Sequence, residues 1–467
     1  MTTTLVKERA PKASPLERLE LLCDPGSLEP LRTGVVSTRL GDRSRADDGV
    51  LAAAGRVDGR PMFCYSQDPS YLGGSLGEAH AGSIVRVMEL AARGGVPVVG
   101  FVESGGARLQ EGHAALAGYG RIFRRSVELS ASVPQISVVC GVSAGGGAYS
   151  PALTDFVVMT ERGRMFLTGP RVVRAALGEE VTMEELGGAR VQGRNGVAQF
   201  VVADEDEAAK LARQLLALLP GRIGELSPRW IPDQPSADPS ATVPAEARRV
   251  YDVRDVIAAS VDSGQLLEVS PRWAPNMVTA ICRIDGRPVG VIANQPRQLA
   301  GVIDAPAAEK ASDFIWRCER FRLPLVVFVD TPGFMPGLRQ ESNAVIRHGA
   351  NLLRSFAGAT VPKLTVVLRK AYGGAVITMN SRQLGADVVF AWPGAEIGIM
   401  AAQQAVQIVH RRELEADRSI GEDLALAYGE KHLSASAAAA SGFVDEVIDS
   451  TLTQQRLARA LEWLEPR

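Results

Sequence analysis

The sequence predicts an α/β protein made of two tandem copies of one domain. Three observations support this prediction: short motifs recur once in each half, apolar β-branched segments alternate with amphipathic helical ones, and a proline-rich stretch separates the halves. A chain of 467 residues is also too long for one hydrophobic core of ordinary size. Two large domains therefore fit the chain better than one.

The repeat consists of matched motifs at a nearly constant separation. Gly59-Arg60-Pro61 recurs 227 residues later as Gly286-Arg287-Pro288. At the same separation Glu103 and Gly106 correspond to Asp330 and Gly333. After one inserted residue the match continues, because VPQISVVCGVSAGGGA from position 133 corresponds to VPKLTVVLRKAYGGAV from position 361. We interpret the chain as a tandem duplication.

Each half alternates strand-like and helix-like segments. The runs VPVVGFVES, ISVVCGV, LVVFVDT and LTVVLRK are nearly continuous apolar stretches, as expected for strands buried on both faces. Helical segments such as SIVRVMELAAR and ASDFIWRCERF lie between them. This order indicates βαβ units around a buried sheet in each half.

The segment boundaries follow from local signals. Ser14-Pro15 followed by Glu17 is a capping-box start, so residues 1–45 are expected to form a helical arm that packs onto another part of the protein. Residues 46–227 form the first domain and residues 251–467 the second. The proline-rich segment 228–250 between them cannot continue a helix or a central strand, so it is the expected linker.

Composition favours a small-molecule enzyme of the cytoplasm. The chain has 51 Lys and Arg against 53 Asp and Glu, which gives no reason to expect a nucleic acid or a membrane as partner. The amino terminus lacks a signal-like apolar segment, and no run of eighteen apolar residues occurs. The five cysteines are scattered without a C-x-x-C pair and are expected to be buried thiols of a reducing compartment.

The strongest chemical signal is a glycine turn between a buried strand and a helix, present once in each half. The turns are Gly145-Gly146-Gly147 and Gly373-Gly374-Ala375. Glycine lets the backbone approach a ligand, and free N–H groups at the start of the following helix can bind an oxyanion. A second turn follows the preceding strand in each half, and it could add donors from Ser104, Gly105, Gly106 and Ala107 in the first half and from Gly333 and Phe334 in the second.

Other catalytic patterns are not found. The five histidines show no metal-ligand spacing, and the sequence contains neither a G-x-S-x-G nucleophile motif nor a P-loop. Two oxyanion sites without an evident protein acid, base or nucleophile suggest that the two ligands react with each other. Transfer of a carboxyl group from carboxybiotin to the α-carbon of an acyl-CoA has this form, because negative charge develops on the thioester oxygen and on the ureido oxygen of biotin.

The chain resembles the carboxyltransferase β subunits of acetyl- and propionyl-CoA carboxylases over residues 16–450. The segments that carry the resemblance are FCYSQDPSYLGGSLGEAHA, SGGARLQEG, AGGGAYSPALTD, MFLTGP, EELGGA, ANQP, DTPGFMPG, IRHGANLL, RKAYGGA and FAWPGAEI. The resemblance implies a tandem duplication of the crotonase-like (ββα-superhelix) domain. It also implies a hexamer, a trimer of dimers, in which each active site combines the first domain of one subunit with the second domain of its dimer partner.

The resemblance further implies roles for single residues. Gly145 and Gly146 are expected to bind the acyl-CoA thioester oxygen, and Gly374 and Ala375 the biotin oxygen. Substrate contacts are expected from both glycine turns and their neighbours, namely Ser104, Gly105, Gly106, Ala107, Arg108, Tyr149, Gly333, Phe334, Tyr372, Gly373 and Ile377. No biotin-acceptor or ATP-grasp motif occurs, so carboxybiotin is expected to arrive on a biotin carboxylase or biotin carboxyl carrier subunit.

Ile377 bears on the identity of the acyl group. In the resembling family this position is commonly Asp in propionyl-CoA carboxylases and apolar, often Ile, in enzymes that accept acetyl-CoA well. The sequence therefore predicts carboxylation of acetyl-CoA to malonyl-CoA, with propionyl-CoA also accepted. The plain alternative is that Ile377 is a core residue of the helix that follows the glycine turn.

The chain departs from the family pattern in two loops, which leaves other functions open. The loop with Gln192 and Asn195 lacks the usual His and Ser-Gly pair, and Gln403-Gln404 replace the usual Lys-Gly. One alternative is a relative that decarboxylates malonyl- or methylmalonyl-CoA or transfers the carboxyl group to another acceptor. Another is a non-catalytic scaffold of a carboxylase, although both glycine turns are intact.

Overall fold

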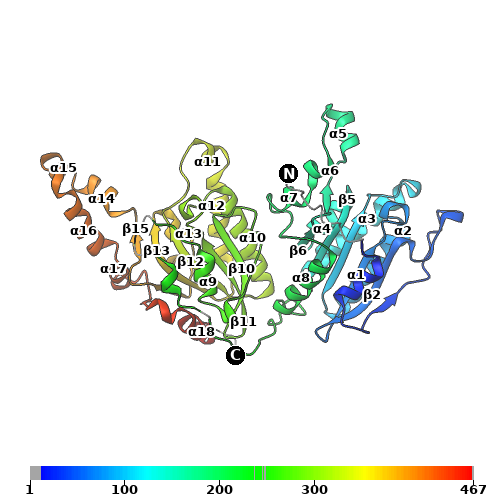
Figure 1. The fold of residues 1–467 in the computed structure, drawn as a ribbon, viewed down its shortest axis with the longest axis horizontal. Helices are drawn as coiled ribbons and strands as arrows, with labels where there is room; N and C mark the ends of the chain where they lie inside the picture. The colour runs from blue at the N-terminus through cyan, green and yellow to red at the C-terminus, as the bar shows by residue number, and fades with distance from the viewer. Residues whose placement is uncertain (1–11, 236, 245, 247–248, 465–467) are drawn as a thin grey trace, which may run out of the picture. The chain divides into compact units, whose positions relative to one another are not determined.

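The computed structural model describes residues 12–235, 237–244, 246 and 249–464 (Figure 1). The chain divides into two compact units, Met1–Ala217 with Gly221–Ile223 and Leu218–Pro220 with Gly224–Arg467. Each unit contains one eight-stranded sheet with helices packed on it. Among the described helices, none combines the length and the apolar character needed to cross a membrane.

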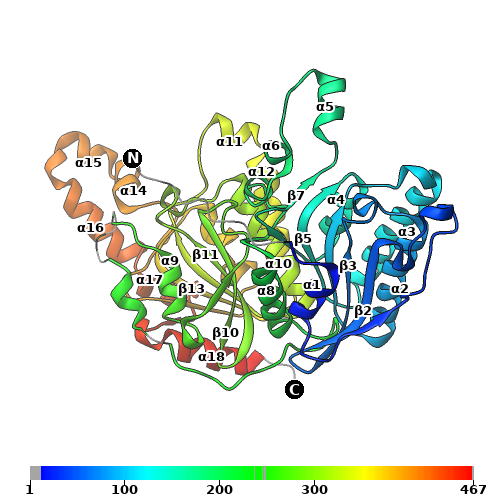
Figure 2. The ribbon, with the colours of Figure 1, turned by 45° about the vertical axis from the view of Figure 1, so that its right-hand side comes forward.

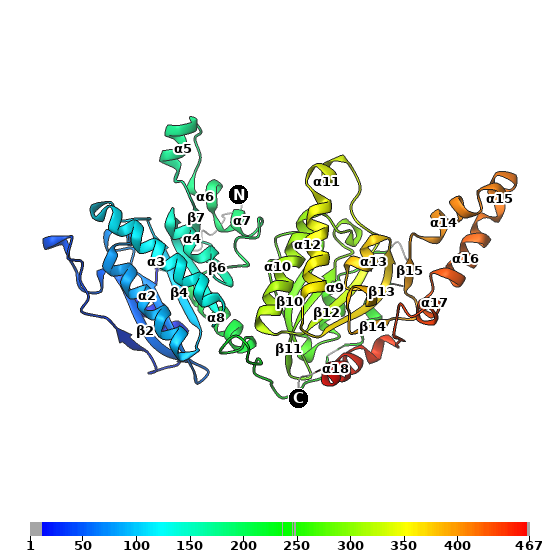
Figure 3. The same ribbon diagram turned by 180° about the vertical axis from the view of Figure 1, so that it is seen from behind.

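The first sheet has the strand order β1-β2-β3-β4-β5-β6-β8, and β7 pairs with the far end of β5. Strands β1, β2 and β3 are antiparallel, and the pairs from β3 onward are parallel. Helices α2 and α3 pack side by side against this sheet (Figure 3). The strands are β1 Glu29–Leu31, β2 Val50–Val57, β3 Arg60–Gln67, β4 Val98–Ser104, β5 Gln135–Ala144, β6 Phe156–Thr160, β7 Arg164–Phe166 and β8 Phe200–Val202. The helices are α1 Pro15–Leu22, α2 Glu78–Gly94, α3 His113–Ser130, α4 Gly146–Ala152, α5 Pro170–Leu177, α6 Met183–Gly187, α7 Ala189–Gln192 and α8 Glu205–Leu218.

The second sheet has the order β16-β14-β13-β12-β11-β10-β9, and β15 pairs with the far end of β13. Helices α10 and α12 pack side by side against it, and α14, α15 and α16 project from the unit as a group (Figure 2). The strands are β9 Leu266–Glu268, β10 Met277–Ile284, β11 Arg287–Asn294, β12 Leu325–Thr331, β13 Lys363–Tyr372, β14 Val388–Ala391, β15 Glu396–Gly398 and β16 Glu446–Val447. The helices are α9 Val253–Ala258, α10 Ala305–Phe321, α11 Leu338–Ser342, α12 Val345–Gly358, α13 Gly374–Thr378, α14 Ala402–Val409, α15 Arg411–Ala416, α16 Gly421–His432, α17 Ala435–Ala440 and α18 Thr453–Leu464.

The duplication extends to single turns and irregularities. The β2–β3 hairpin turns at Asp58-Gly59, with φ of 50° and 75°, and the β10–β11 hairpin turns at Asp285-Gly286, with φ of 53° and 74°. Two successive positive φ values are the mark of a type I′ turn, which explains why Asp-Gly recurs at both hairpins. Both sheets also have a register shift at the same place, between β4 and β5 and between β12 and β13.

Among the described residues of the N-terminal segment, α1 packs against β2 and β3 and belongs to the repeated unit. The predicted capping box of Ser14 and Glu17 is confirmed at its start, and α9 in the second unit begins with the side chain of Asp252 as its cap. In both units an aspartate beyond this helix, Asp24 or Asp262, accepts the N–H groups of the Asp-Gly hairpin turn. Helix α1 is therefore the counterpart of α9.

The proline-rich segment lies along the second unit. The Trp230 N–H donates to the Gly286 carbonyl at 2.9 Å, and the Trp230 ring stacks on the Arg283 guanidinium, 4.0 Å from the ring centre. The only regular structure in its described residues is a short 3-10 helix, Pro239–Thr242. All five cysteines are buried free thiols, as expected.

Candidate active site

The two glycine turns have the same backbone geometry. Each follows the long central strand of its sheet, and each begins with a glycine of positive φ: Gly145 at 58° and Gly373 at 63°. With ψ of −124° and −150° these conformations are open only to glycine. The Gly145 N–H donates to the Phe166 carbonyl at 3.0 Å, and the Gly373 N–H donates to the Gly398 carbonyl at 2.9 Å. The first glycine of each turn is thus tied to the short strand beside it.

The free donors come from the next two residues. In the described part of the chain, the amides of Gly146 and Gly147 have no hydrogen-bond acceptor, and the same holds for Gly374 and Ala375. They are the first amides of α4 and α13, which have no acceptor inside a helix. The donor pair of the first turn is therefore shifted by one residue from the predicted pair, because the Gly145 amide is already used.

The two turns differ in the space around them. A Cβ placed on Gly146 would lie 2.8 Å from the Tyr119 ring, and the Tyr119 hydroxyl is 3.2 Å from the Ser104 hydroxyl. A Cβ on Gly374 would meet no atom within 4 Å. The first turn is therefore closed on one side by an aromatic ring, whereas the second is open.

In the turns that follow β4 and β12, three of the amides expected as donors already have acceptors. The Gly105 N–H donates to the Gly73 carbonyl at 3.0 Å, and the Gly106 N–H donates to the Ser104 hydroxyl at 3.2 Å. In the second unit the Gly333 N–H donates to the Thr331 hydroxyl at 3.3 Å. Ala107 and Phe334 form isolated bridges with Leu76 and Ile303. These contacts hold each turn against the loop that precedes the neighbouring helix.

Arg108 does not present its side chain to a ligand. Its guanidinium is fully buried, donates to Asp48 at 2.6 Å and Glu111 at 2.8 Å, and also donates to the carbonyls of Asp48 and Ser75. The family resemblance implies a substrate contact for Arg108. In the structure residues 46–49 fold over it, so Arg108 holds the loop together.

Tyr149 and Ile377 are the fourth residues of α4 and α13 and correspond to each other in the repeat. Their side chains are 50% and 49% exposed. The Tyr149 ring meets Phe123 edge-on, with the ring centres 6.1 Å apart. Ile377 is therefore not a core residue, and it remains available to line a substrate site.

Tyr372 is the last residue of β13 and is nearly buried. Its hydroxyl donates to the Glu396 carboxylate. Burial, together with this neighbouring carboxylate, raises the pKa of Tyr372. At neutral pH its hydroxyl therefore stays protonated and anchors β15. The Gly398 carbonyl of this strand also accepts the Gly373 N–H.

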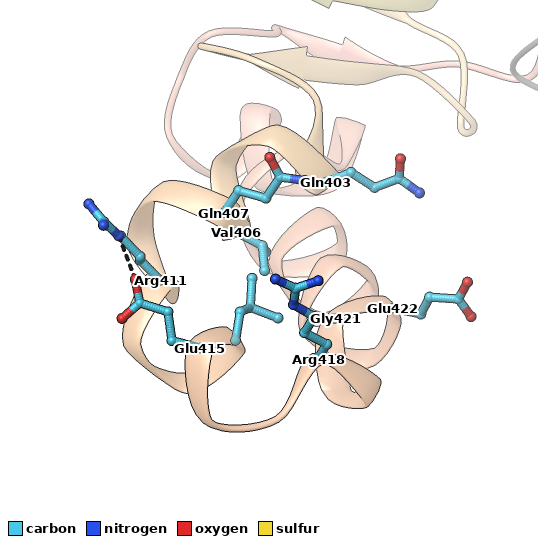
Figure 4. A pocket seen from close by; sticks show the side chains of 9 residues that line it. Gln403, Val406, Gln407, Arg411, Glu415, Arg418, Gly421 and Glu422 are labelled. Atoms are coloured by element: carbon cyan, nitrogen blue, oxygen red, sulfur yellow. Dashed lines mark hydrogen bonds and ion pairs between the residues drawn. The ribbon is translucent and has the colours of Figure 1, made fainter.

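The two loops that differ from the family sequence pattern lie in different surroundings. Gln192 donates to the Met165 carbonyl at 2.5 Å and accepts from Asn195 at 2.9 Å, so this loop supports β7. Gln403 lines a surface pocket of about 630 Å³ between α14, α15 and α16, where Arg411 pairs with Glu415 (Figure 4). No residue of either glycine turn lines that pocket.

Known proteins share the sequence pattern of this chain. A family model described as a carboxyl transferase domain matches residues 8–467. The chain belongs to the carboxyl transferase family. It is 44% identical to the methylmalonyl-CoA carboxyltransferase 12S subunit of Propionibacterium freudenreichii subsp. shermanii, over 97% of this chain and 88% of that protein. It is also 44% identical to the propionyl-CoA carboxylase beta chain of Saccharopolyspora erythraea, over 97% and 88% of the two chains.

A crystal structure of transcarboxylase 12S with methylmalonyl-coenzyme A and methylmalonic acid bound superimposes on this carboxyltransferase with a TM-score of 0.93. The two are 43% identical, over 98% of this chain and 91% of that one. The carboxyltransferase therefore has the duplicated crotonase-like fold that the sequence predicted. Among its described residues, no group of three or more His, Cys, Asp or Glu could hold a metal ion.

Several residues that shape the turns of the carboxyltransferase had no sequence signal. Tyr119 reaches Gly146 from the middle of a long amphipathic helix, where a tyrosine is an ordinary core residue. Phe166 and Gly398 act through their backbone carbonyls, which any residue would provide. A comparison of the two repeats could have found Phe166 and Gly398, because each is the last residue of a short strand that follows the glycine turn.

Proposed function

We propose that the two glycine turns are the oxyanion sites of a carboxyl transfer between biotin and a short acyl-CoA. Gly146 and Gly147 would receive the thioester oxygen, and Gly374 and Ala375 the ureido oxygen. The observation that carries the proposal is the repeated turn, in which one amide is tied to a strand and the next two have no acceptor. Preorganised donors of this kind stabilise charge that develops in the transition state.

The chain's own part in the reaction is to bind, orient and stabilise. Biotin, when bound, brings the carboxyl group on a ureido nitrogen, and that nitrogen can take the α-proton of the acyl-CoA once its bond to the carboxyl carbon has broken. The Gly146 and Gly147 amides stabilise the thioester oxygen as the α-carbon loses its proton and bonds to the carboxyl carbon. The Gly374 and Ala375 amides stabilise the ureido oxygen as the carboxyl group leaves.

The acyl group we propose is acetyl, with propionyl also accepted, and Ile377 is the residue that supports this choice. Its apolar side chain is half exposed three residues after Gly374, so it adds no carboxylate near the acyl end. One methylene changes affinity by only about 1–3 kcal/mol in an apolar pocket, so the preference is expected to be modest. The test is the ratio of kcat/KM for acetyl-CoA and propionyl-CoA in wild type and Ile377→Asp. Use of propionyl-CoA alone, or an unchanged ratio, would remove Ile377 from the argument.

We also propose that the carboxyl group reaches this chain on a separate biotin-bearing protein. The sequence has no biotin-acceptor motif and no ATP-grasp motif. The purified chain should therefore exchange carboxyl groups between malonyl-CoA and free biotin, yet hydrolyse no ATP until a biotin carboxylase is added. Bicarbonate-dependent ATP turnover by the single protein would contradict this. Absence of exchange would favour a scaffold role.

The proposed assembly is a hexamer whose dimer is obligatory. Both units expose large apolar side chains at corresponding places: Leu167 and Ile399 directly after β7 and β15, and Leu177 and Val409 at the ends of α5 and α14. We propose that these side chains contact neighbouring subunits of the assembly. The related transcarboxylase 12S is described as a hexamer in a multienzyme core. Light scattering that found a fully active monomer would refute the proposal.

The acceptor of the carboxyl group needs its own test. At the same 44% identity the relatives include the methylmalonyl-CoA decarboxylase subunit alpha of Veillonella parvula, over 89% of this chain and 82% of that protein, so identity alone does not choose the acceptor. ATP-dependent carboxylation requires malonyl-CoA to form from acetyl-CoA in the reconstituted complex. Decarboxylation or transfer without net carboxylation would instead place the chain with its other relatives.

A further inference from the structure

A buried carboxylate lies at the point where each sheet bends toward its glycine turn. In the first unit the register passes from the pair Val102 and Val139 to the pair Ser104 and Ser143, so Glu103 lies at a bulge opposite three residues of β5. Its carboxylate rests on Gly141, where a Cβ would lie 2.0 Å from the Glu103 carboxylate. The residues of β5 that follow Gly141 lead directly into the glycine turn. The orientation of this strand end therefore depends on the packing of the Glu103 carboxylate.

Arg18 of α1 supplies the buried counter-charge. Its side chain is 0% exposed, and its Nη2 donates to Glu103 at 2.9 Å and to Glu205 at 3.4 Å. The Lys12 ammonium also pairs with Glu103 from a partly exposed position. The Glu103 N–H is bonded to the Gln67 side chain at 2.9 Å, so the backbone at the bulge is held as well. One arginine thus joins α1, the end of β4 and the start of α8.

The second unit achieves the same pairing with an arginine from another position. Asp330, the counterpart of Glu103, lies at the equivalent bulge and is fully buried. The Arg369 guanidinium donates to it at 3.1 Å, and the Tyr251 hydroxyl donates to it at 2.9 Å. Arg369 occupies the position of Gly141 in the repeat, and Val256 occupies the position of Arg18. The arginine lies on a helix in the first unit and on a strand in the second, whereas the charge pair is kept.

We propose that Arg18 and Arg369 are positioning residues for the reaction, each of which sets the strand end that presents its unit's glycine turn. This inference rests on the proposed oxyanion role of the turns. A buried carboxylate that loses its partner must find water or take up a proton, and the bulge must then move. Because α4 and α13 begin directly after these strand ends, the free amides would move with them. Arg18 thus supports the first turn, and Arg369 supports the second.

The test compares arginine variants in the exchange between malonyl-CoA and free biotin. Displacement of a catalytic group by about 1 Å can cost on the order of 100-fold in rate, so Arg18→Met should lower kcat by about this factor and leave the KM for biotin unchanged. Arg18→Lys should recover part of kcat. The double variant Arg18→Met with Glu103→Gln should recover at least tenfold over Arg18→Met, because it removes a buried charge whose remaining cation is the partly exposed Lys12.

Arg369→Met is the equivalent substitution in the second unit, and it should lower kcat while the KM for malonyl-CoA stays unchanged. Arg213→Met is the matched control, because Arg213 also ties α1 to its surroundings, through Leu22 and Asp24, without touching Glu103. It should keep wild-type kcat. All variants are compared at equal folded fraction, measured by circular dichroism, so that a loss of stability is distinguished from a loss of kcat.

Two results would overturn the inference. One is a folded Arg18→Met enzyme with wild-type kcat. The other is a loss of kcat that Glu103→Gln does not relieve. If Arg18→Met does not fold, the double variant and Arg18→Lys give the same comparison. A failure of the oxyanion proposal is recognised independently, because Gly374→Pro would then retain activity whatever the arginine variants do.

Discussion

The free amide of Gly374 can be removed by proline, whose ring Cδ takes the place of the N–H hydrogen. Gly374 is the first residue of α13, where proline is tolerated because the missing N–H has no helical acceptor. The preceding residue, Gly373, has an extended ψ of −150°, which avoids the helical conformation that proline disfavours in the residue before it. Gly374→Pro should therefore fold and lose one donor. Gly374→Ala keeps the donor and places its Cβ in open space.

The expected magnitude follows from the number of donors. Each turn offers two free amides, and loss of one oxyanion donor costs about 2.7–4 kcal/mol of transition-state stabilisation, or about 100- to 1000-fold in kcat. Gly374→Pro should lose at least about 100-fold in kcat, because the donor is lost and the Cδ faces the oxyanion. Gly374→Ala should stay near wild type. The equivalent change at Gly146 is less informative, because any side chain there would collide with the Tyr119 ring.

The assay is the exchange between malonyl-CoA and free biotin, which needs no partner protein. A Gly374→Pro enzyme that keeps near-normal kcat would refute the assignment of Gly374 as a donor. Equal losses in Gly374→Pro and Gly374→Ala would show that space at the turn matters, and not the N–H group.

Three further predictions concern buried polar groups. Arg108→Met should lower the free energy of unfolding by about 3–5 kcal/mol in urea titrations, because it leaves the buried carboxylates of Asp48 and Glu111 without their cation. Burial lowers the pKa of His80 to about 3, so the unfolded chain binds a proton that the folded chain does not as pH falls from about 6.5 toward 3. Stability should fall in that window by up to about 1.4 kcal/mol per pH unit more in wild type than in His80→Gln. Lys310→Met should cost about 1–3 kcal/mol for each of the two buried carbonyls, of Trp273 and Met277, that lose their donor, and thermal unfolding checks this.

Local sequence signals predicted the elements that depend on neighbours in the chain. The capping box of α1 and the strand before each glycine turn both follow from residues a few positions apart. The engagement of the Gly145 amide could not be predicted in this way, because its acceptor belongs to Phe166, on a strand of three residues. The burial of Arg108 likewise depends on Asp48, sixty positions away, so a motif that placed it beside a substrate site was misleading.

Features that both repeats share serve the fold, and features that differ between them serve the individual ligands. Both retain the positive φ of the first glycine, the tie to a short strand, the two free amides and the paired carboxylate at the bulge. They differ in what surrounds the turn: Tyr119 covers Gly146, whereas Gly374 is open. A ring beside the donors excludes water and strengthens their electrostatic effect on a thioester oxygen. A biotin group that is delivered on another protein must enter and leave the site, so its turn needs open space. The difference between the two turns therefore agrees with the proposed assignment of acyl-CoA to Gly146 and biotin to Gly374.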